Sequence, residues 1–306
     1  MATGWEMLPD AAKALSAPVT KLVEVVAAGC GRIYGPTDIR RTARAEADAA
    51  VLLAEADARR SEIAVRAAQR VLDIEESRQA NIESITAIAA KQLPNEVSER
   101  SVEKDWATRF FREAQDISNE QMQQLWAKLL AGEVARPGAF SVRTLSVASN
   151  LSPAEAQQFG AVCRLVGKVG NHGLGLFLTN LNAPYMIAMG LSYDSFEALE
   201  AAGLVLRTEM PVVIASDSAH RMHSIERPGD LLLVAKSTIA DTSGLPLGQV
   251  ALTPAGAELF AIADWAACSD HDNEIIQVLE RYRWKVEKKL IGGRTATGTH
   301  GIPWPK

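Results

Sequence analysis

The sequence predicts a mainly α-helical protein with an α+β part toward its C-terminus, and three observations support this. Residues 38–93 contain neither glycine nor proline. Residues 101–169 repeat apolar side chains three and four positions apart, and from residue 170 glycines separate short apolar runs typical of strands. The expected parts are, in order, a short amphipathic N-terminal segment (1–37), a long coiled-coil-like helical arm (38–93), a small helical bundle (101–169), a winged-helix-like α+β domain (170–270), and a basic C-terminal helix with a tail (274–306).

The N-terminal segment contains four apolar residues at the spacing of a short amphipathic helix. They are Val19, Leu22, Val23 and Val26. No run of 18 apolar residues surrounds them, so we expect no membrane-spanning helix. The polar face carries one lysine and one glutamate rather than the basic face of a membrane-surface helix. We expect the helix to pack on protein, and membrane contact through these four residues is the alternative.

The arm is expected to be one long helix between Pro36 and Pro94. At 1.5 Å per residue, an unbroken helix over residues 38–93 would be about 80 Å long. Its apolar positions are mostly three or four residues apart, and its first half is rich in alanine. Because such a helix buries too little by itself, it needs a partner. The partner is either another segment of the same chain or a second copy, and we favour self-association.

Four short helices are expected in the bundle. Patterns that cap helices occur at Ser118-Asn-Glu-Gln121 and at Ser152-Pro153. The helix after the first cap has apolar residues at i, i+3, i+4, i+7 and i+8, which is typical of a helix that faces a core. These residues are Met122, Leu125, Trp126, Leu129 and Leu130.

The order of elements over residues 170–270 resembles winged-helix domains. A helix over 192–203 is followed by a helix that Thr253 and Pro254 begin, and strand candidates are at 176–178, 204–207, 212–215, 231–235 and 249–252. Winged helices often bind DNA, but many only mediate protein contacts. Residues 192–203 include three acidic and no basic side chains, the wrong sign for a DNA groove. We therefore expect this domain to contact protein rather than nucleic acid.

The last helix is expected over residues 274–289 and ends in basic and aromatic side chains. They are Arg281, Arg283, Trp284, Lys285, Lys288 and Lys289. These side chains either contact an anionic partner or complement the helix dipole, which needs no ligand. We favour the second interpretation.

No motif in the sequence specifies a reaction. The P-loop, dinucleotide-binding, zinc-protease and nucleophile-elbow patterns are absent. His220 and His223 form an HxxH pair without a third ligand at a sensible spacing, so we expect a polar loop there. The sequence therefore predicts no catalytic residue, no cofactor and no metal, and an enzyme is not the favoured class.

Composition and cysteines favour a soluble, cytoplasmic protein. The chain has 306 residues, 32 basic and 37 acidic side chains, a net charge of −5 and 47% hydrophobic residues. A mildly acidic chain is a poor general binder of nucleic acid. The cysteines Cys30, Cys163 and Cys268 are far apart and form no CxxC motif, so no disulfide framework is expected and a reducing compartment fits.

Several stretches carry a resemblance to a known family. They are Gly35–Arg44, Arg78–Ile85, Asp105-Trp106, Met122–Glu133 and Pro137–Leu145. They resemble the signature of an uncharacterised bacterial family catalogued as a domain of unknown function, over about residues 33–260. The resemblance implies no catalytic residue, and we interpret its signature positions as structural. These positions are Arg78, Gln79, Asn81, Asp105, Trp106, Trp126, Leu130, Glu133, Pro137, Ser141 and Arg143. More distantly, Leu125–Ala131 followed by Leu151–Ala156 is similar to the abortive-infection alpha family, implicated in resistance to phage.

The function that these observations favour is self-assembly without catalysis, in the cytoplasm and in the context of phage defence. The expected partners are further copies of the chain and a phage or host protein. Two alternatives stay open. The first is a membrane-acting effector that uses the N-terminal segment and is therefore membrane-associated, and the second is a regulator that binds nucleic acid through the basic C-terminal residues.

Overall fold

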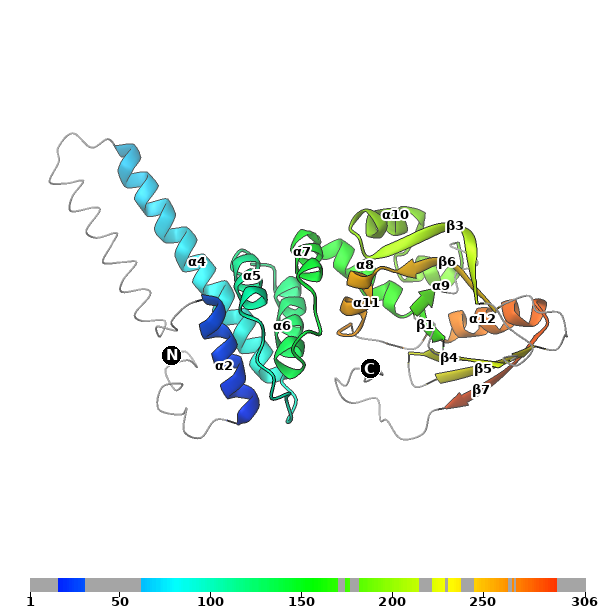
Figure 1. The fold of residues 1–306 in the computed structure, drawn as a ribbon. Helices are drawn as coiled ribbons and strands as arrows, with labels where there is room; N and C mark the ends of the chain where they lie inside the picture. The colour runs from blue at the N-terminus through cyan, green and yellow to red at the C-terminus, as the bar shows by residue number, and fades with distance from the viewer. Residues whose placement is uncertain are drawn as a thin grey trace. The chain divides into compact units, whose positions relative to one another are not determined.

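Figure 1 shows the fold of the chain in a computed structural model. The structure describes residues 16–30, 62–169, 174–176, 182–214, 222–228, 231–237, 245–263, 266 and 268–290. The chain divides into two compact units, residues 1–145 and 146–306. The expected mainly helical fold with an α+β part toward the C-terminus is confirmed, and the structure shows that the sheet of this part is antiparallel. No helix within the described ranges is long and apolar enough to span a bilayer.

The first unit is a helical bundle with an aromatic centre. Its helices are α2 (Ala17–Cys30), α4 (Glu62–Gln92), α5 (Lys104–Ala114) and α6 (Glu120–Ala135), and α7 (Val142–Asn150) spans the boundary between the units. The ring of Phe110 lies 5.2 Å from that of Trp106, 5.1 Å from that of Phe111 and 5.2 Å from that of Trp126. All four residues are buried, so the three α5 aromatics and Trp126 of α6 form one packed cluster.

Helix α4 is the described part of the expected arm. Its 31 residues make it about 46 Å long, and residues 38–61 of the expected arm lie outside the described residues. Only its C-terminal half packs in the bundle, where Asn81, Ile85, Thr86 and Ala89 are buried. In Figure 1 the other half of α4 projects past α5 and α6.

The helix caps agree with the sequence in one place and differ by one residue in another. The capping box at Ser152 is confirmed, because its Oγ accepts the Glu155 N–H at 3.2 Å and the Glu155 carboxylate accepts the Ser152 N–H at 2.8 Å. Helix α6 begins one residue later than the expected cap. Asn119 rather than Ser118 accepts the Met122 N–H, at 3.1 Å.

The second unit is built on one antiparallel sheet. Its helices are α8 (Pro153–Cys163), α9 (Pro184–Ala188), α10 (Tyr193–Ala201), α11 (Pro254–Phe260) and α12 (Ser269–Arg281). Among the described residues, seven strands lie in the order β3 (Val205–Ile214), β6 (Leu245–Leu252), β2 (Leu174–Leu176), β1 (Val166–Val169), β4 (Met222–Arg227), β5 (Leu231–Ser237) and β7 (Trp284–Leu290). All six strand pairs are antiparallel. The fourth helix expected in the bundle, α8, belongs to this unit, since the division falls within α7.

Helix α12 covers part of the sheet. Its residues Ile275 and Leu279, one turn apart, are 1% and 0% exposed and share a buried cluster with Ile225 of β4, Leu233 of β5 and Trp284 of β7. In Figure 1, α12 lies over β4, β5 and β7. This packing holds the N-terminal end of α12 beside β1 and β4, where the polar residues described below meet.

The C-terminal helix ends earlier than the sequence prediction, which was wrong for its last residues. Helix α12 ends at Arg281, and residues 284–290 form strand β7. Arg283 has a φ of 64°, a backbone conformation that ends a helix. Trp284 and Val286 then face the core while the residues between and after them are exposed, which is the two-residue alternation of a strand.

Candidate functional sites

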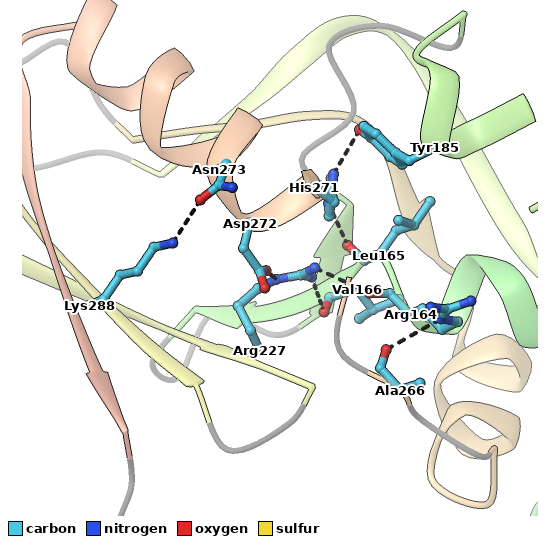
Figure 2. Close-up of polar contacts among 10 residues, drawn as sticks. All are labelled: Arg164, Leu165, Val166, Tyr185, Arg227, Ala266, His271, Asp272, Asn273 and Lys288. Carbon is cyan, nitrogen blue, oxygen red and sulfur yellow. Dashed lines mark hydrogen bonds and ion pairs between the residues drawn. The ribbon is translucent and has the colours of Figure 1, made fainter. Parts of the chain in front are cut away.

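A group of buried and half-buried polar side chains joins α12 to the rest of the second unit, as Figure 2 shows for most of its members. We call it the Arg227 network. It consists of Tyr185 of α9, Arg227 of β4, and His271, Asp272 and Glu274 of α12. Arg227, His271 and Asp272 are 3%, 0% and 4% exposed, so the polar atoms depend on one another for hydrogen bonds.

Arg227 is the centre of this network. Its Nε–H donates to Oδ1 of Asp272 at 2.7 Å. Its two terminal nitrogens donate to the carbonyl oxygens of Val166 and, at 3.2 Å, Arg164. Burial lowers the pKa of Arg227, and the charge of Asp272 opposes this effect. Both members of the ion pair are therefore shielded from water, and all three guanidinium nitrogens of Arg227 donate to protein groups.

His271 and Tyr185 extend the network to a second carboxylate. Nε2 of His271 lies 3.1 Å from the carbonyl oxygen of Leu165, which can only accept, so Nε2 donates. Nδ1 lies 3.0 Å from the Tyr185 hydroxyl, which donates its one proton to a carboxylate oxygen of Glu274. The carbonyl oxygens of residues 164, 165 and 166 thus all accept from the network. The connection from α8 to β1 is held to α12 and β4.

The protonation states indicate a structural role for the network. Burial, together with the positive charge of Arg227, lowers the pKa of His271 to about 3. Burial raises the pKa of the Tyr185 hydroxyl, and the neighbouring carboxylate of Glu274 raises it too. Neither group titrates near pH 7, where general acids and bases work best. The network can fix the fold, but these two groups are not poised to exchange protons.

We expect His271 to make the second unit acid-sensitive. The unfolded chain binds a proton on this histidine below about pH 6.5, whereas the folded protein does not until about pH 3. Stability therefore falls as the pH is lowered through this window, by about 2 kcal/mol between pH 7 and pH 5. Urea unfolding at both pH values should show this loss in the wild type and a smaller loss in His271→Asn. Equal losses in both proteins would contradict the assignment.

Sequence reasoning did not single out the network. A usable signal was present in α12, where Cys268, His271, Asp272, Ile275 and Leu279 share one helical face at spacings of three and four. Two polar residues on an otherwise apolar face must be buried with partners. Which residues supply those partners, 45 to 106 positions away in the chain, is settled only by the fold.

The projecting half of α4 is the second candidate site. Four residues form what we call the outer stripe: Ile63, Ala67, Val71 and Ile74. Ile63, Val71 and Ile74 are 67%, 57% and 41% exposed, and Ala67 is half-buried. Large apolar side chains in a line at spacings of three and four are typical of a helix that packs on another helix.

Polar residues mark the place where α4 leaves the bundle. Arg78 donates from Nε to Oδ1 of Asp116 at 2.7 Å and from Nη1 to Glu75 at 3.0 Å. One turn further, the Asn81 side chain donates to the carbonyl oxygen of Gln115 at 2.8 Å and accepts from Gln123 at 3.2 Å. The loop between α5 and α6 is thereby fastened to α4 at the end of the outer stripe.

The remaining signature positions lie in the first unit. Trp106, Trp126 and Leu130 are core residues at 4%, 0% and 0% exposure. Glu133 is buried and accepts the N–H groups of Gly138 at 2.6 Å and Phe140 at 3.0 Å, and its burial raises the pKa of its carboxyl group. Gln79 bonds Glu83, and Ser141 accepts the N–H of Thr144. Asp105 and Arg143 are exposed, and Pro137 is buried in the turn after α6.

The structure packs the N-terminal amphipathic helix against α5. Leu22 and Val26 are 2% and 6% exposed, while Val19 and Val23 are half-buried. A Cβ atom at Gly29 would lie 2.3 Å from the Phe111 ring and 2.8 Å from the Ala107 carbonyl oxygen, so α2 and α5 approach closely. Two of the four residues considered for membrane contact are therefore enclosed by protein.

The basic C-terminal residues are not gathered on one helix face. Arg281 ends α12, Arg283 occupies the turn, and Trp284, Lys285, Lys288 and Lys289 lie in β7. Trp284 is buried, and Nζ of Lys288 donates to Asn273 at 2.7 Å. His223 of the HxxH pair is 8% exposed in β4 and packs on the Trp284 ring, whereas His220 lies outside the described residues. Among the residues that the structure describes, no three His, Cys, Asp or Glu residues are grouped to hold a metal ion.

Comparison with known families agrees with the resemblance to an uncharacterised family catalogued as a domain of unknown function. The model of a protein family of unknown function, DUF2806, matches residues 65–276. The chain belongs to the DUF2806 family. The matched region of this DUF2806 protein includes Ala67, Val71 and Ile74 of the outer stripe, the first unit's α5 and α6, and the Arg227 network. No curated protein and no solved structure matches the chain.

Proposed function

We propose that this DUF2806 protein is a self-assembling protein without catalytic activity, in which the outer stripe of α4 binds a second copy of the chain. The observation that supports this is the exposure of Ile63, Val71 and Ile74 in one line. Burial of a large apolar side chain contributes about 1.5–3 kcal/mol. A helix that leaves three such side chains in water on one face favours association with another helix.

The proposal predicts that polar substitution of the stripe abolishes self-association. We would measure the mass of the full chain by light scattering over a range of concentrations for the wild type and for Ile63→Ser/Val71→Ser/Ile74→Ser. The wild type should show a mass that rises with concentration, and the variant should stay monomeric. Since the three side chains are exposed, circular dichroism should show an unchanged fold.

Val65→Ser is the matched control for this experiment. Val65 is 43% exposed but lies on the opposite side of α4, about 160° around the helix axis from Ala67 of the outer stripe. It should self-associate like the wild type. A wild-type chain that is monomeric throughout, or a stripe variant that assembles as the wild type does, would overturn the proposal.

Phage defence is the biological context that we propose for the assembly. Its support is the similarity of Leu125–Ala131 and Leu151–Ala156 to the abortive-infection alpha family. The stripe variant also tests this context, because cells that express it should lose any protection that the wild type gives in a plaque assay. Equal plaque numbers with and without the wild-type protein would remove the defence context and leave the assembly untouched.

The winged-helix-like part is proposed to contact protein. The order of elements supports the winged-helix likeness, because β2, β6 and β3 are neighbours in the sheet and α9 and α10 lie between β2 and β3 in the chain. Arg207 of β3 lies on this part but is engaged by Glu200 at 2.6 Å and lies over the Tyr193 ring. With Asp194 and Glu197 also on α10, the helix surface is acidic, which favours a protein over a nucleic-acid partner.

The alternative of a membrane-acting effector would require α2 to leave α5. Leu22 and Val26 would then exchange a protein environment for lipid, and the buried α5 residues Ala107 and Phe111 would lose part of their cover. This exchange gains no apolar burial. We therefore propose protein packing as the role of α2.

A further inference from the structure

The structure also points to a binding surface on β7, in the second unit. We propose that an extended acidic segment of a partner protein pairs with β7 as a further antiparallel strand. Two lysines of β7, Lys285 and Lys289, would bind the carboxylates of that segment. Because β7 and the outer stripe of α4 belong to different units, the two surfaces are independent.

Strand β7 forms one margin of the described sheet. All seven of its residues pair with β5, from Trp284 beside Ser237 to Leu290 beside Leu231. In the part of the chain that the structure describes, β5 is the one strand that pairs with β7, and Figure 1 shows β7 beside β5 at the margin. The N–H and C=O groups on the other side of such a strand can hydrogen-bond an extended peptide.

The two faces of β7 differ in chemistry. Val286 packs against the buried cluster that includes α12, and Nζ of Lys288 donates to Asn273 of α12 (Figure 2). Since side chains alternate along a strand, Leu290 lies on this same face, where it is 81% exposed. The opposite face, which we call the outer face, carries the exposed residues Lys285, Glu287 and Lys289.

The lysines of the outer face favour an anionic partner. Lys285 lies directly opposite Lys236 of β5, and like charges at directly opposite positions of two strands repel each other. All three lysines are exposed, and within the described ranges Lys236, Lys285 and Lys289 form no hydrogen bond or ion pair. A carboxylate beside Lys285 would offset this repulsion.

The spacing of charges on the outer face defines the segment that fits. Directly opposite residues of an antiparallel pair share a face. Lys285 and Lys289 therefore match two acidic residues four positions apart, about 13 Å along a strand. Glu287 lies midway between the lysines and requires an uncharged residue opposite it. A continuous row of phosphates would be repelled by Glu287, so a peptide fits this face better than a nucleic acid.

The other face of β7 adds an apolar requirement. Val286 is half-buried and Leu290 is exposed, so apolar side chains opposite them would extend the apolar surface of the sheet. Lysines at a sheet margin also discourage pairing with unrelated apolar strands. Acidic residues at the matching positions convert that repulsion into attraction, which makes the pairing selective.

Peptide binding to the full chain tests the proposal. The probe is fluorescein-labelled Ile-Glu-Thr-Thr-Val-Glu, whose six residues would lie opposite Leu290 to Lys285 in that order, and fluorescence anisotropy measures its affinity. We expect the wild type to bind it and Lys285→Glu/Lys289→Glu to bind it about tenfold more weakly or worse. The matched control is Lys91→Glu/Lys104→Glu, which makes the same charge change at exposed lysines of the first unit and should bind like the wild type.

A second peptide tests the spacing of the acids. Thr-Ile-Glu-Glu-Val-Thr has the same composition, but its adjacent carboxylates point to opposite faces of a strand. It should bind the wild type more weakly than the probe does. Equal affinity for the two peptides would overturn the assigned register.

N-methylation of the probe separates strand pairing from attraction between charges alone. Backbone N–H groups of a strand point alternately to its two sides. Of two probes methylated at the odd or at the even positions, one should lose binding and the other should keep it. Equal affinity of the two methylated probes, binding that survives Lys285→Glu/Lys289→Glu, or no binding to the wild type at millimolar probe would each overturn the proposal.

Discussion

Replacement of Arg227 by methionine is expected to destabilise the second unit by about 3–5 kcal/mol, because it leaves the Asp272 carboxylate buried without its cation. The substitution also removes the donors to the carbonyl oxygens of Arg164 and Val166. Asp272 is 4% exposed, so water cannot replace these contacts without opening the core. Urea unfolding followed by tryptophan fluorescence measures the effect, since Trp284 lies in this unit's core.

Two further variants make the prediction specific to the buried pair. Arg227→Met/Asp272→Leu removes both charges and should recover part of the lost stability, as apolar replacements of buried pairs often do. Lys288→Gln removes an exposed hydrogen bond to Asn273 and should change stability by less than about 0.5 kcal/mol. A single Arg227→Met variant as stable as Lys288→Gln would show that the Arg227 network does not hold the unit together.

The parts of the fold that the sequence predicts well are those with local causes. Apolar residues at spacings of three and four are sufficient to predict α6, and the capping box at Ser152 is sufficient to predict the start of α8. In both cases the interacting groups lie within one or two turns of the same helix. The strands β1 and β4 were missed. β1 has four residues and β4 has six, and the two strands pair with each other although they are far apart in the chain, so neither carries a strong local signal.

The two candidate sites differ in how far the sequence predicts them. The outer stripe follows from the spacing of Ile63, Ala67, Val71 and Ile74, although only the structure shows that α6 covers the same face one turn beyond Arg78. The Arg227 network could not be assembled from sequence. Arg227 and Asp272 are 45 residues apart and meet because α12 packs on β4 and β5.

Gly256→Ala is expected to destabilise the second unit by about 3 kcal/mol, although an alanine normally stabilises a helix. A Cβ atom at Gly256 in α11 would lie 2.0 Å from the carbonyl oxygen of Leu204 and 3.0 Å from its carbonyl carbon. These are backbone atoms and cannot rotate away. Thr253 holds the contact in place, since its N–H donates to Leu204 at 3.1 Å and its hydroxyl to Gly203 at 2.6 Å.

Gly160→Ala supplies the opposite result in the same unit. Gly160 lies in α8, and an added Cβ atom would meet nothing within 4 Å. This substitution should therefore stabilise the unit by about 0.5–1 kcal/mol, the ordinary gain from replacing a helical glycine. Both variants replace glycine with alanine, but the predicted changes in the free energy of unfolding have opposite signs. Urea unfolding therefore separates the effect of helix propensity from the effect of the close contact with the Leu204 backbone. Stabilisation by both would mean that α11 can move away from Leu204, and that the start of β3 does not depend on this close contact.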